Sequence, residues 1–291
     1  MSDYASPVCF AGDFDRETAP AKINLALHVR GRRPDGYHEL ETLFAFARHG
    51  DELSVEAAPD VSLSVTGPFA AQLAGEADNL VLRAARQLAE YGDISRGGHI
   101  TLVKNLPVAS GIGGGSADAA AALRMLDRFW RIGSPQDDLL AIAASLGADV
   151  PACLVGRTAV GTGRGDALEV IADDDLTGRP LLLVNPLQPV STAEIFRRWD
   201  GVDRGPLRDG PPSDVMASGR NDLEPMARAL CPEIGEILAL LKSLADRSLA
   251  RMSGSGATCF ALFANDSARD AAERAIHARF PAYWTLASHV A

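Results

Sequence analysis

The fold is decided by the stretch Leu106-Pro107-Val108-Ala109-Ser110-Gly111-Ile112-Gly113-Gly114-Gly115-Ser116-Ala117-Asp118, in which four glycines in five positions lead into an alanine-rich helix. Glycine has no Cβ atom, so the backbone can turn with positive φ and its N–H groups can approach an anion closely. The helix that follows adds unpaired N–H groups and the positive end of its dipole. The stretch therefore predicts a phosphate-binding loop. The alternative is a flexible turn, which rarely precedes a helix as strong as Ala119 to Leu126.

The loop matches neither of the two best-known nucleotide motifs. A Walker A loop ends in Gly-Lys-Ser/Thr, whereas Gly115 is followed directly by Ser116. The dinucleotide fingerprint requires a third glycine, and counting from Gly111 and Gly113 places Ser116 there. What remains is a loop that binds phosphate through backbone amides. Ser116 is expected to cap the helix N-terminus and to offer its hydroxyl to a phosphate oxygen or Mg²⁺.

The composition limits the class of protein. The chain has 291 residues, of which 47% are hydrophobic, enough for one large domain or two modest ones. Its formal net charge of −10 argues against a nucleic-acid partner, because such binding relies on basic surface, and anionic substrates would need local positive charge. Apolar runs such as Leu181 to Val184 are too short to span a membrane, and Met1 to Pro20 contains no apolar signal-peptide core. A cytoplasmic protein is expected.

Cysteine and lysine are both used sparingly. The four cysteines form no C-x-x-C pair, so neither a zinc site nor a disulfide framework is predicted. Only three of the 28 basic residues are lysines. Lysine is a compact point charge that can lie beside a reacting oxygen or a phosphate, which makes each one a candidate, although genome composition explains Lys242 at least as well. These residues are Cys9, Cys153, Cys231, Cys259, Lys22, Lys104 and Lys242.

The first part of the chain alternates between strand and helix patterns. Residues 1–18 show no periodicity and are expected to form a tail. Residues 21–29 alternate apolar and polar side chains, which predicts a strand with Lys22 and Asn24 on one face. Further elements are expected as strands over 37–46, 51–66 and 99–103 and as helices over 79–91 and 116–130.

A second helix is expected to begin with Ser134 as its N-cap and Pro135 at its first position and to stop at Gly147. Its end leads to Asp149, which is held on stiff backbone beside Pro151. From local sequence alone, the favoured interpretation is that Asp149 caps a following helix.

The second part of the chain is expected to form a domain of its own. Residues 180–185 have the pattern of a buried strand, residues 232–244 that of a helix, and a second glycine loop over 252–257 precedes a strand over 258–263. We therefore predict a tail over 1–18, an N-terminal domain over 19–178 and a C-terminal domain over 179–291.

Four segments occur together in an order that resembles the GHMP small-molecule kinases. The resemblance covers nearly the whole chain and implies an α+β, two-domain fold. An N-terminal βαβ-type nucleotide-binding domain and a C-terminal ferredoxin-like α/β domain would enclose the active site in the cleft between them. The segments are Pro20-Ala21-Lys22-Ile23-Asn24-Leu25, Gly113-Gly114-Gly115-Ser116, Leu146-Gly147-Ala148-Asp149-Val150-Pro151 and Met252-Ser253-Gly254-Ser255-Gly256-Ala257.

Two further segments resemble one branch of that family. Asp35-Gly36-Tyr37-His38-Glu39-Leu40 and Asn221-Asp222-Leu223-Glu224 are similar to members that act on a methylerythritol carrying cytidine diphosphate, in the non-mevalonate isoprenoid pathway. The resemblance implies transfer of the ATP γ-phosphate, with Mg²⁺, to the tertiary 2-hydroxyl of the acceptor. A kinase of mevalonate, homoserine or a sugar is the alternative, and it would not need Tyr37 and His38. A non-catalytic nucleotide-binding protein would be expected to lack Lys22 or Asp149.

The resemblance also implies a role for individual residues. Lys22 and Asp149 fall on the catalytic pair, which replaces the capping interpretation of Asp149. Many relatives carry a second serine where this chain has Ala117, so the metal-linked hydroxyl falls on Ser116. The expected ATP-binding residues are Asn79, Lys104, Pro107, Val108, Ala109, Ser110, Gly111, Ile112, Gly113, Gly114, Gly115, Ser116 and Ala117. The expected substrate-binding residues are Asn24, Tyr37, His38, Phe196, Gly254, Ser255 and Gly256.

The expected partners are small molecules only, namely ATP and the cytidine diphosphate acceptor. Neither nucleic acid nor a membrane is expected to bind. The chain is expected to be a monomer or a weak homodimer.

Overall fold

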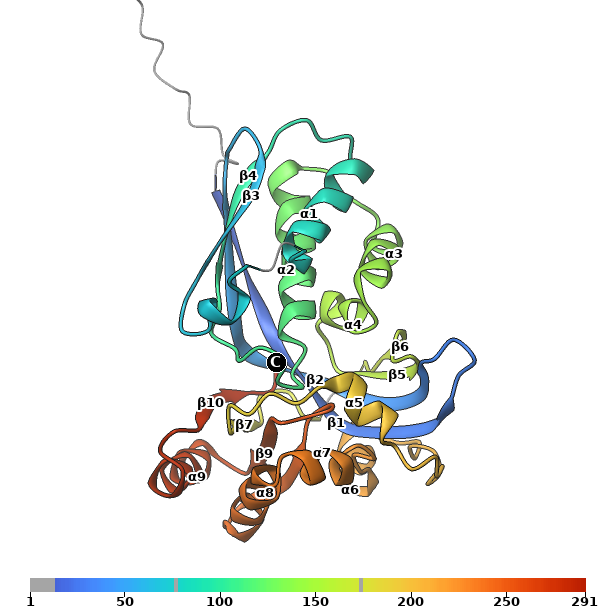
Figure 1. The fold of residues 1–291 in the computed structure, drawn as a ribbon, viewed down its shortest axis with the longest axis vertical. Helices are drawn as coiled ribbons and strands as arrows, with labels where there is room; N and C mark the ends of the chain where they lie inside the picture. The colour runs from blue at the N-terminus through green and yellow to red at the C-terminus, as the bar shows by residue number, and fades with distance from the viewer. Residues whose placement is uncertain (1–13, 76–77, 173–174) are drawn as a thin grey trace, which may run out of the picture.

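The chain forms two lobes, each built on its own sheet (Figure 1). A computed structural model describes residues 14–75, 78–172 and 175–291. The strands β1 (Phe14–Arg32) and β2 (His38–Glu56) form a long antiparallel hairpin that runs from the upper lobe into the lower one. In the parts of the chain described, no helix has both the length and the apolarity needed to cross a membrane.

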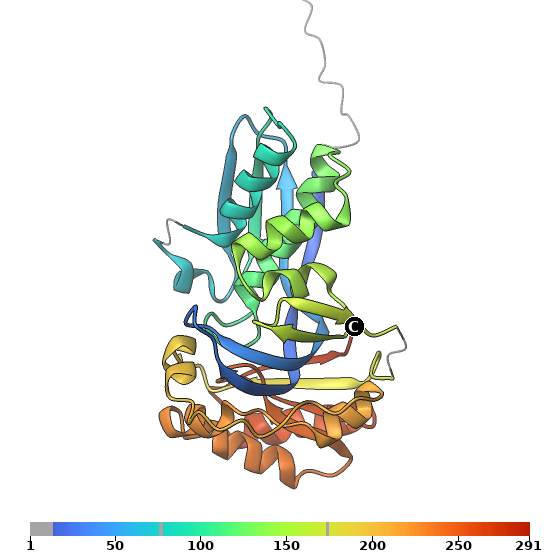
Figure 2. The same cartoon turned by 90° about the vertical axis from the view of Figure 1, so that its right-hand side faces the viewer.

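The upper lobe contains a six-stranded sheet in the order β3-β4-β2-β5-β6, with β1 paired to β2. Strands β3 and β4 are parallel, and α1 crosses between them, so the predicted βαβ unit is present. Helices α1 to α4 lie on one side of this sheet (Figure 2). The bounds are β3 Val61–Thr66, η1 Ala70–Leu73, α1 Leu80–Tyr91, β4 Gly98–Val103, α2 Gly114–Trp130, α3 Gln136–Leu146, α4 Val150–Val155, β5 Ala159–Gly163 and β6 Ala167–Val170.

Helix α2 lies at the centre of the upper lobe. Its alanines from Ala119 to Ala122 are fully buried, and such small side chains let the helix lie close against its neighbours. Larger side chains of the same helix, including Leu123, Leu126 and Trp130, complete the core. The start of α2 is thereby fixed where the glycine loop meets β1.

The lower lobe contains a four-stranded antiparallel sheet in the order β10-β7-β9-β8. With helices between the first and second and between the third and fourth strands, this is the ferredoxin-like arrangement that was predicted. The helices lie below the sheet in Figure 2. The bounds are β7 Pro180–Asn185, α5 Thr192–Arg197, α6 Pro212–Ser218, α7 Glu224–Leu230, α8 Glu233–Ser243, β8 Arg247–Met252, β9 Cys259–Phe263, α9 Asp266–Arg279 and β10 Trp284–His289.

Both faces of the second sheet are buried, which explains the continuous apolar run of β7. Leu182 and Val184 face the core formed with the helices, whereas Leu181 and Leu183 pack against residues of β1 and β2. Alternate side chains of one strand therefore serve two cores. The second core joins the two lobes along the lower part of the hairpin.

Several sequence predictions need correction. Residues 1–13 of the expected tail lie outside the described residues, but residues 14–18 already belong to β1, paired with β2 from Glu56 to Glu52. Pairing with a distant strand supplies order that the local sequence does not reveal. The strand expected over 51–66 is two strands, because the chain turns between Glu56 and Val61.

Two helix starts also differ from the prediction. Helix α2 begins at Gly114, with Gly113 at its N-cap and a φ of 64°, so Ser116 is the third helical residue and not the cap. Glycine allows this earlier start. Helix α3 has Pro135 as its N-cap, while the hydroxyl of Ser134 donates to Asp127 Oδ1 at 2.5 Å.

Candidate active site

A cavity of about 930 Å³ lies where the two lobes meet. The glycine loop, the hairpin of β1 and β2, helix α5 and the second glycine loop all contribute to its wall. Most of the residues predicted from sequence are brought together here. They are Lys22, Asn24, Tyr37, His38, Val108, Ala109, Ser110, Gly111, Gly113, Gly114, Gly115, Ser116, Asp149, Phe196, Gly254 and Ser255.

Lys22 and Asp149 form an ion pair in this cavity. Lys22 Nζ lies 3.1 Å from Asp149 Oδ2 and also donates to Asn24 Oδ1 at 3.1 Å. Lys22 is buried on β1, whereas the side chain of Asp149 is 41% exposed. Asp149 does occupy the N-cap position of α4, but its side chain makes no capping hydrogen bond. The carboxylate is thus turned to Lys22 and the cavity, not to the helix.

The glycine loop packs against the second glycine loop, and its backbone faces the cavity. A Cβ atom on Gly111 would lie 2.6 Å from the carbonyl oxygen of Gly256, and one on Gly113 would lie 3.0 Å from Lys22 Cε. The backbone therefore has no room for side chains at these two positions. The first N–H groups of α2, from Gly114 to Ser116, have no acceptor within the helix and are available to an anion.

Lys104 lies beneath the loop and holds it through two carboxylates. Its Nζ is 2.5 Å from Asp51 Oδ2 and 2.6 Å from Asp118 Oδ2, and all three side chains are buried. Burial alone would lower the pKa of Lys104, but Asp118 and Asp51 outweigh it and the pKa is raised. Burial also raises the pKa of Asp118 to about 7, with Lys104 opposing the shift.

Lys104 belongs to a smaller cavity of about 110 Å³ behind the glycine loop, shared with Asn79 and Pro107. Asn79 is the N-cap of α1, and its side chain accepts from Val81 N at 2.9 Å. These three predicted ATP-binding residues therefore adjoin the loop, since Gly114 and Gly115 line the same small cavity. Their contact with nucleotide stays a prediction.

Three further predicted site residues line neither of these two cavities. Ile112 is fully buried in the core between the lobes, and Ala117 is buried in the core of the upper lobe. Gly256, with a φ of 88°, packs against Met252. The alternation of loop residues between cavity and core could not be deduced from the sequence, because it depends on the curvature of the loop.

An aromatic cluster also contributes to the wall of the cavity. The His38 ring is 5.0 Å from that of Phe196 and meets Trp199 edge-on at 5.6 Å. Burial and then Arg32 lower the pKa of His38, which favours its neutral form. Among the described residues, the buried Nε2 of His38 has no hydrogen-bond partner. Tyr37 is exposed, with the Arg164 guanidinium 5.1 Å above its ring.

Three arginines of the cavity wall were missed by sequence reasoning. Arg32, Arg164 and Arg197 line the cavity near the aromatic cluster and supply the local positive charge that anionic substrates need. Arg164 stands between two glycines, Gly163 and Gly165, and this was the one local signal available. Arg32 and Arg197 look like ordinary surface residues in the sequence.

The described residues offer little to hold a metal ion by themselves. They contain no group of three His, Cys, Asp or Glu side chains placed to bind one. Cys153, Cys231 and Cys259 are buried and free, while Cys9 lies outside the described residues.

Comparisons with known proteins agree with this geometry. Residues 79–157 match the family model of the GHMP kinases N terminal domain, and residues 212–282 match that of the GHMP kinases C terminal. A protein of Rhizorhabdus wittichii named 4-diphosphocytidyl-2-C-methyl-D-erythritol kinase is 54% identical over 276 residues, which is 94% of each chain. The chain belongs to this family of GHMP kinases. It is accordingly an ATP-dependent phosphotransferase.

Other relatives support the same family. The 4-diphosphocytidyl-2-C-methyl-D-erythritol kinase of Novosphingobium aromaticivorans is 52% identical to this kinase and covers 93% of its chain and 91% of its own. A crystal structure of 4-(cytidine 5'-diphospho)-2C-methyl-D-erythritol kinase superposes with a TM-score of 0.79 at 35% identity, covering 94% of this chain and 99% of that one. A homoserine kinase from Cytophaga hutchinsonii, at 18% identity and a TM-score of 0.73, shares the fold.

Proposed function

We propose that this kinase transfers the γ-phosphoryl group of ATP to the tertiary 2-hydroxyl of 4-diphosphocytidyl-2-C-methyl-D-erythritol. One observation carries the proposal: a single cavity is lined by the Lys22–Asp149 pair, by the glycine loop and by His38 and Phe196 of the aromatic cluster. A phosphate donor and an acceptor that carries a base could therefore meet at the ion pair.

Asp149 would act on the acceptor hydroxyl. A tertiary hydroxyl is a poor nucleophile, and a carboxylate within hydrogen-bond reach can accept its proton as the phosphoryl group moves. Lys22 Nζ, 3.1 Å from Asp149 Oδ2, would stabilise the negative charge that develops on the hydroxyl oxygen. Asn24 would hold the Lys22 ammonium in place, because its Oδ1 accepts from Nζ at 3.1 Å.

The glycine loop would bind the phosphates of ATP through the N–H groups that begin α2. For Mg²⁺ the residues fit a site completed by the substrate, since Ser116 lines the cavity beside the N–H groups that begin α2. Magnesium usually keeps several waters and binds chiefly to substrate phosphates. When bound, the ion would neutralise charge on those phosphates.

The aromatic cluster would bind the cytosine. Stacking on Tyr37 or Phe196 supplies affinity without choosing between bases. The choice would come from hydrogen bonds, and the buried, unpaired Nε2 of neutral His38 is suited to make one. Arg32 and Arg164 lie near enough to meet the diphosphate.

The experiment is an assay of ADP formation with a panel of alcohols. The panel contains 4-diphosphocytidyl-2-C-methyl-D-erythritol, its uridine analogue, mevalonate and homoserine. We expect turnover with the first compound to exceed turnover with mevalonate and homoserine by orders of magnitude. Comparable turnover with mevalonate or homoserine would refute the proposed acceptor while leaving the kinase family intact.

We further propose that this kinase is cytoplasmic, that it is a monomer or weak homodimer, and that it binds neither nucleic acid nor membranes. The net charge of −10 supports the exclusion of nucleic acid. We also retain domain limits at 19–178 and 179–291, with β1 and β2 shared across the boundary. Sedimentation equilibrium tests the oligomeric state, and limited proteolysis tests the domain limits.

A further inference from the structure

A second cavity, of about 660 Å³, lies in the lower lobe, and none of its described lining residues belongs to the active-site cavity. Five of its lining residues are cationic and only two, Asp222 and Glu224, are acidic, although the chain as a whole carries a net charge of −10. The five are Arg204, Arg220, Arg228, Lys242 and Arg251. Positive charge is thus concentrated at one place on an acidic protein.

Three of the five cations already have a carboxylate partner. Arg220 Nε lies 2.6 Å from Asp222 Oδ1, and Arg228 lies 3.6 Å from Glu224. Arg204 pairs with Asp200, whose carboxylate is not part of the cavity wall. The remaining two, Lys242 and Arg251, form no ion pair in the part of the chain that the structure describes. Two positive charges of the cavity wall are therefore not neutralised by a carboxylate of the described residues.

Arg251 is the residue of the cavity that most strongly indicates an anion site. It is only 9% exposed, and its guanidinium donates to the carbonyl oxygens of Leu25, Met216 and Gly219. A guanidinium carries five N–H groups, so donors remain for another acceptor. Burial lowers the pKa of Arg251 to about 10, with Glu224 opposing the shift. A buried cation without a carboxylate is costly, and an anion in the cavity would offset that cost.

We propose that this cavity binds a small polyanion of the diphosphate or triphosphate class. Its volume lies within the range of small-molecule sites, about 300 to 1,000 Å³. Arginine forks match phosphate oxygens in pairs, and Lys242 adds a point charge from the last turn of α8. The site is separate from catalysis and acts through the residues between the two cavities.

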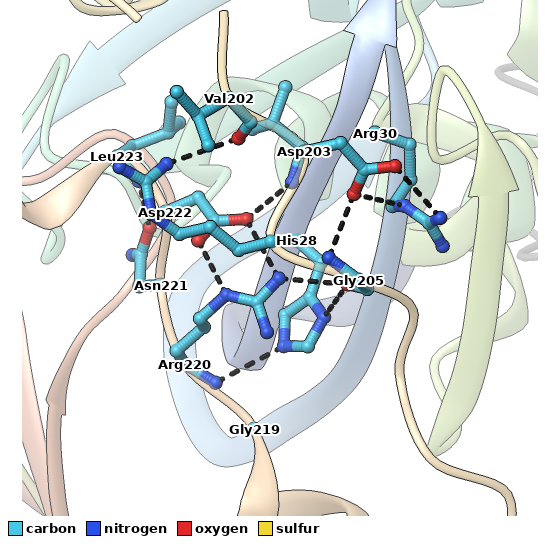
Figure 3. Close-up of polar contacts among 12 residues, drawn as sticks. His28, Arg30, Val202, Asp203, Gly205, Gly219, Arg220, Asn221, Asp222 and Leu223 are labelled. Carbon is cyan, nitrogen blue, oxygen red and sulfur yellow. Dashed lines mark hydrogen bonds and ion pairs between the residues drawn. The ribbon is translucent and has the colours of Figure 1, made fainter. Parts of the chain in front are cut away.

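Asn221 connects the second cavity to the active site. It lines the second cavity, and its Nδ2 donates to the carbonyl oxygens of Met252 at 2.9 Å and Gly254 at 2.8 Å. Gly254 lines the active-site cavity. Figure 3 shows Asn221 and Asp222 beside Arg220, whose guanidinium also donates to the carbonyl oxygen of Gly205 at 2.8 Å. A polyanion that draws Arg220 away from Asp222 would change the support of the loop over 252–256.

The test is calorimetric titration of the full chain with sodium diphosphate. We expect two sites in the parent, one at the glycine loop and one in the second cavity. The double variant Arg228→Glu with Lys242→Glu should lose the second site, with affinity there reduced about tenfold or more, and keep the first. Gly114→Val should lose the first and keep the second.

A matched control carries the same change of charge elsewhere. Arg86 and Arg274 are exposed and lie outside both cavities, so Arg86→Glu with Arg274→Glu should bind like the parent. If the double charge reversal does not fold, Lys242→Ala should still weaken the second site about threefold or more. In Gly114→Val, added diphosphate should also speed amide exchange over 252–256, because the support of that loop is weakened when Arg220 leaves Asp222.

Three outcomes would overturn the proposal. One is unchanged stoichiometry and affinity in the folded Arg228→Glu, Lys242→Glu variant. Another is loss of all diphosphate binding in Gly114→Val. The third is equal weakening in the Arg86→Glu, Arg274→Glu control, which would indicate a general charge effect.

Discussion

The Nζ atom of Lys22 lies 3.1 Å from Oδ2 of Asp149, although the two residues are 127 positions apart in the chain. Lys22 comes from a strand that spans both lobes, and Asp149 from the short link between α3 and α4. Lys22 is buried and Asp149 is partly exposed to the cavity. A substrate can therefore reach the carboxylate without displacing the lysine.

Replacing Lys22 by arginine should not be conservative. The planar guanidinium fork is bulkier than an ammonium, and the Lys22 chain already lies 3.0 Å from the position of a Cβ on Gly113. We expect kcat to fall about tenfold or more in Lys22→Arg while the fold is retained. Steady-state kinetics and circular dichroism measure the two effects. A parent-like kcat would show that Lys22 is only structural.

The loop prediction concerns Gly114. An added Cβ there would lie 3.1 Å from Lys104 Nζ, so a valine side chain would press on the lysine beneath the loop and shift the N–H groups that begin α2 away from phosphate. We expect Gly114→Val to weaken ATP binding about tenfold or more, while Tm without ligand falls only slightly. Calorimetry and thermal unfolding measure these.

The matched control for that experiment is Gly115→Ala. Its Cβ would meet only Leu80 Cδ1, at an ordinary 3.7 Å, and Gly115 is already within helix α2. ATP affinity close to that of the parent is expected. If Gly114→Val also bound ATP normally, the glycine stretch would have to be reassigned as a structural turn.

The base prediction concerns His38. Cytosine offers an exocyclic amine and an N3 acceptor, whereas uracil presents the reverse pair, so a site built for one leaves polar groups unpaired with the other. We expect kcat/KM to favour the cytidine substrate over its uridine analogue by about a hundredfold or more. His38→Ala should reduce that ratio, and Phe196→Leu should largely keep it. Equal kcat/KM for the two analogues in the parent would refute reading of the base.

A pH prediction follows from His28, which is buried beneath the segment that joins α5 to α6. Its Nδ1 lies 3.0 Å from the carbonyl oxygen of Gly205, and its Nε2 accepts from the backbone N–H of Arg220 at 3.3 Å, as Figure 3 shows. Both contacts suit a neutral ring protonated on Nδ1. Burial and then Arg220 lower the pKa of His28 below 6.5, against opposing effects of Gly205, Asp222 and Glu41.

The sign of the effect on stability is fixed by that direction. As pH falls, His28 takes up its proton in the unfolded chain before it does so in the folded chain. The stability that the neutral His28 ring gives the fold is therefore complete above about pH 6.5 and is lost below it. We expect the fall in Tm between about pH 8 and about pH 5.5 to be smaller in His28→Gln than in the parent. Superimposable Tm curves would rule out a role for His28 titration.

Sequence reasoning succeeded where the signal was local. The glycine stretch, the alternation around Lys22 and the glycines of 252–257 are each confined to a few positions, and each led to residues that line the cavity. The α+β fold with its βαβ and ferredoxin-like units was also confirmed. Periodicity and turn chemistry are enough for such features.

The remaining features depend on distant contacts. Residues 14–18 become a strand only because β2 lies beside them. Ser134 lies one residue before the N-cap of α3, where Asp127 Oδ1 accepts from both its backbone N–H and its hydroxyl. Arg164 reaches the cavity only after β5 and β6 fold into a hairpin over Tyr37. The sequence spacing between these partners follows no recognisable pattern, so the sequence alone could not reveal their contacts.

The most direct test of the account is the single-turnover rate of Asp149→Asn with saturating ATP and 4-diphosphocytidyl-2-C-methyl-D-erythritol. Asparagine keeps the size of the side chain but cannot accept the proton of the hydroxyl, so we expect the rate to fall about a hundredfold or more while ATP affinity stays close to that of the parent. A rate within about threefold of the parent would contradict the central claim that Asp149 acts on the acceptor hydroxyl.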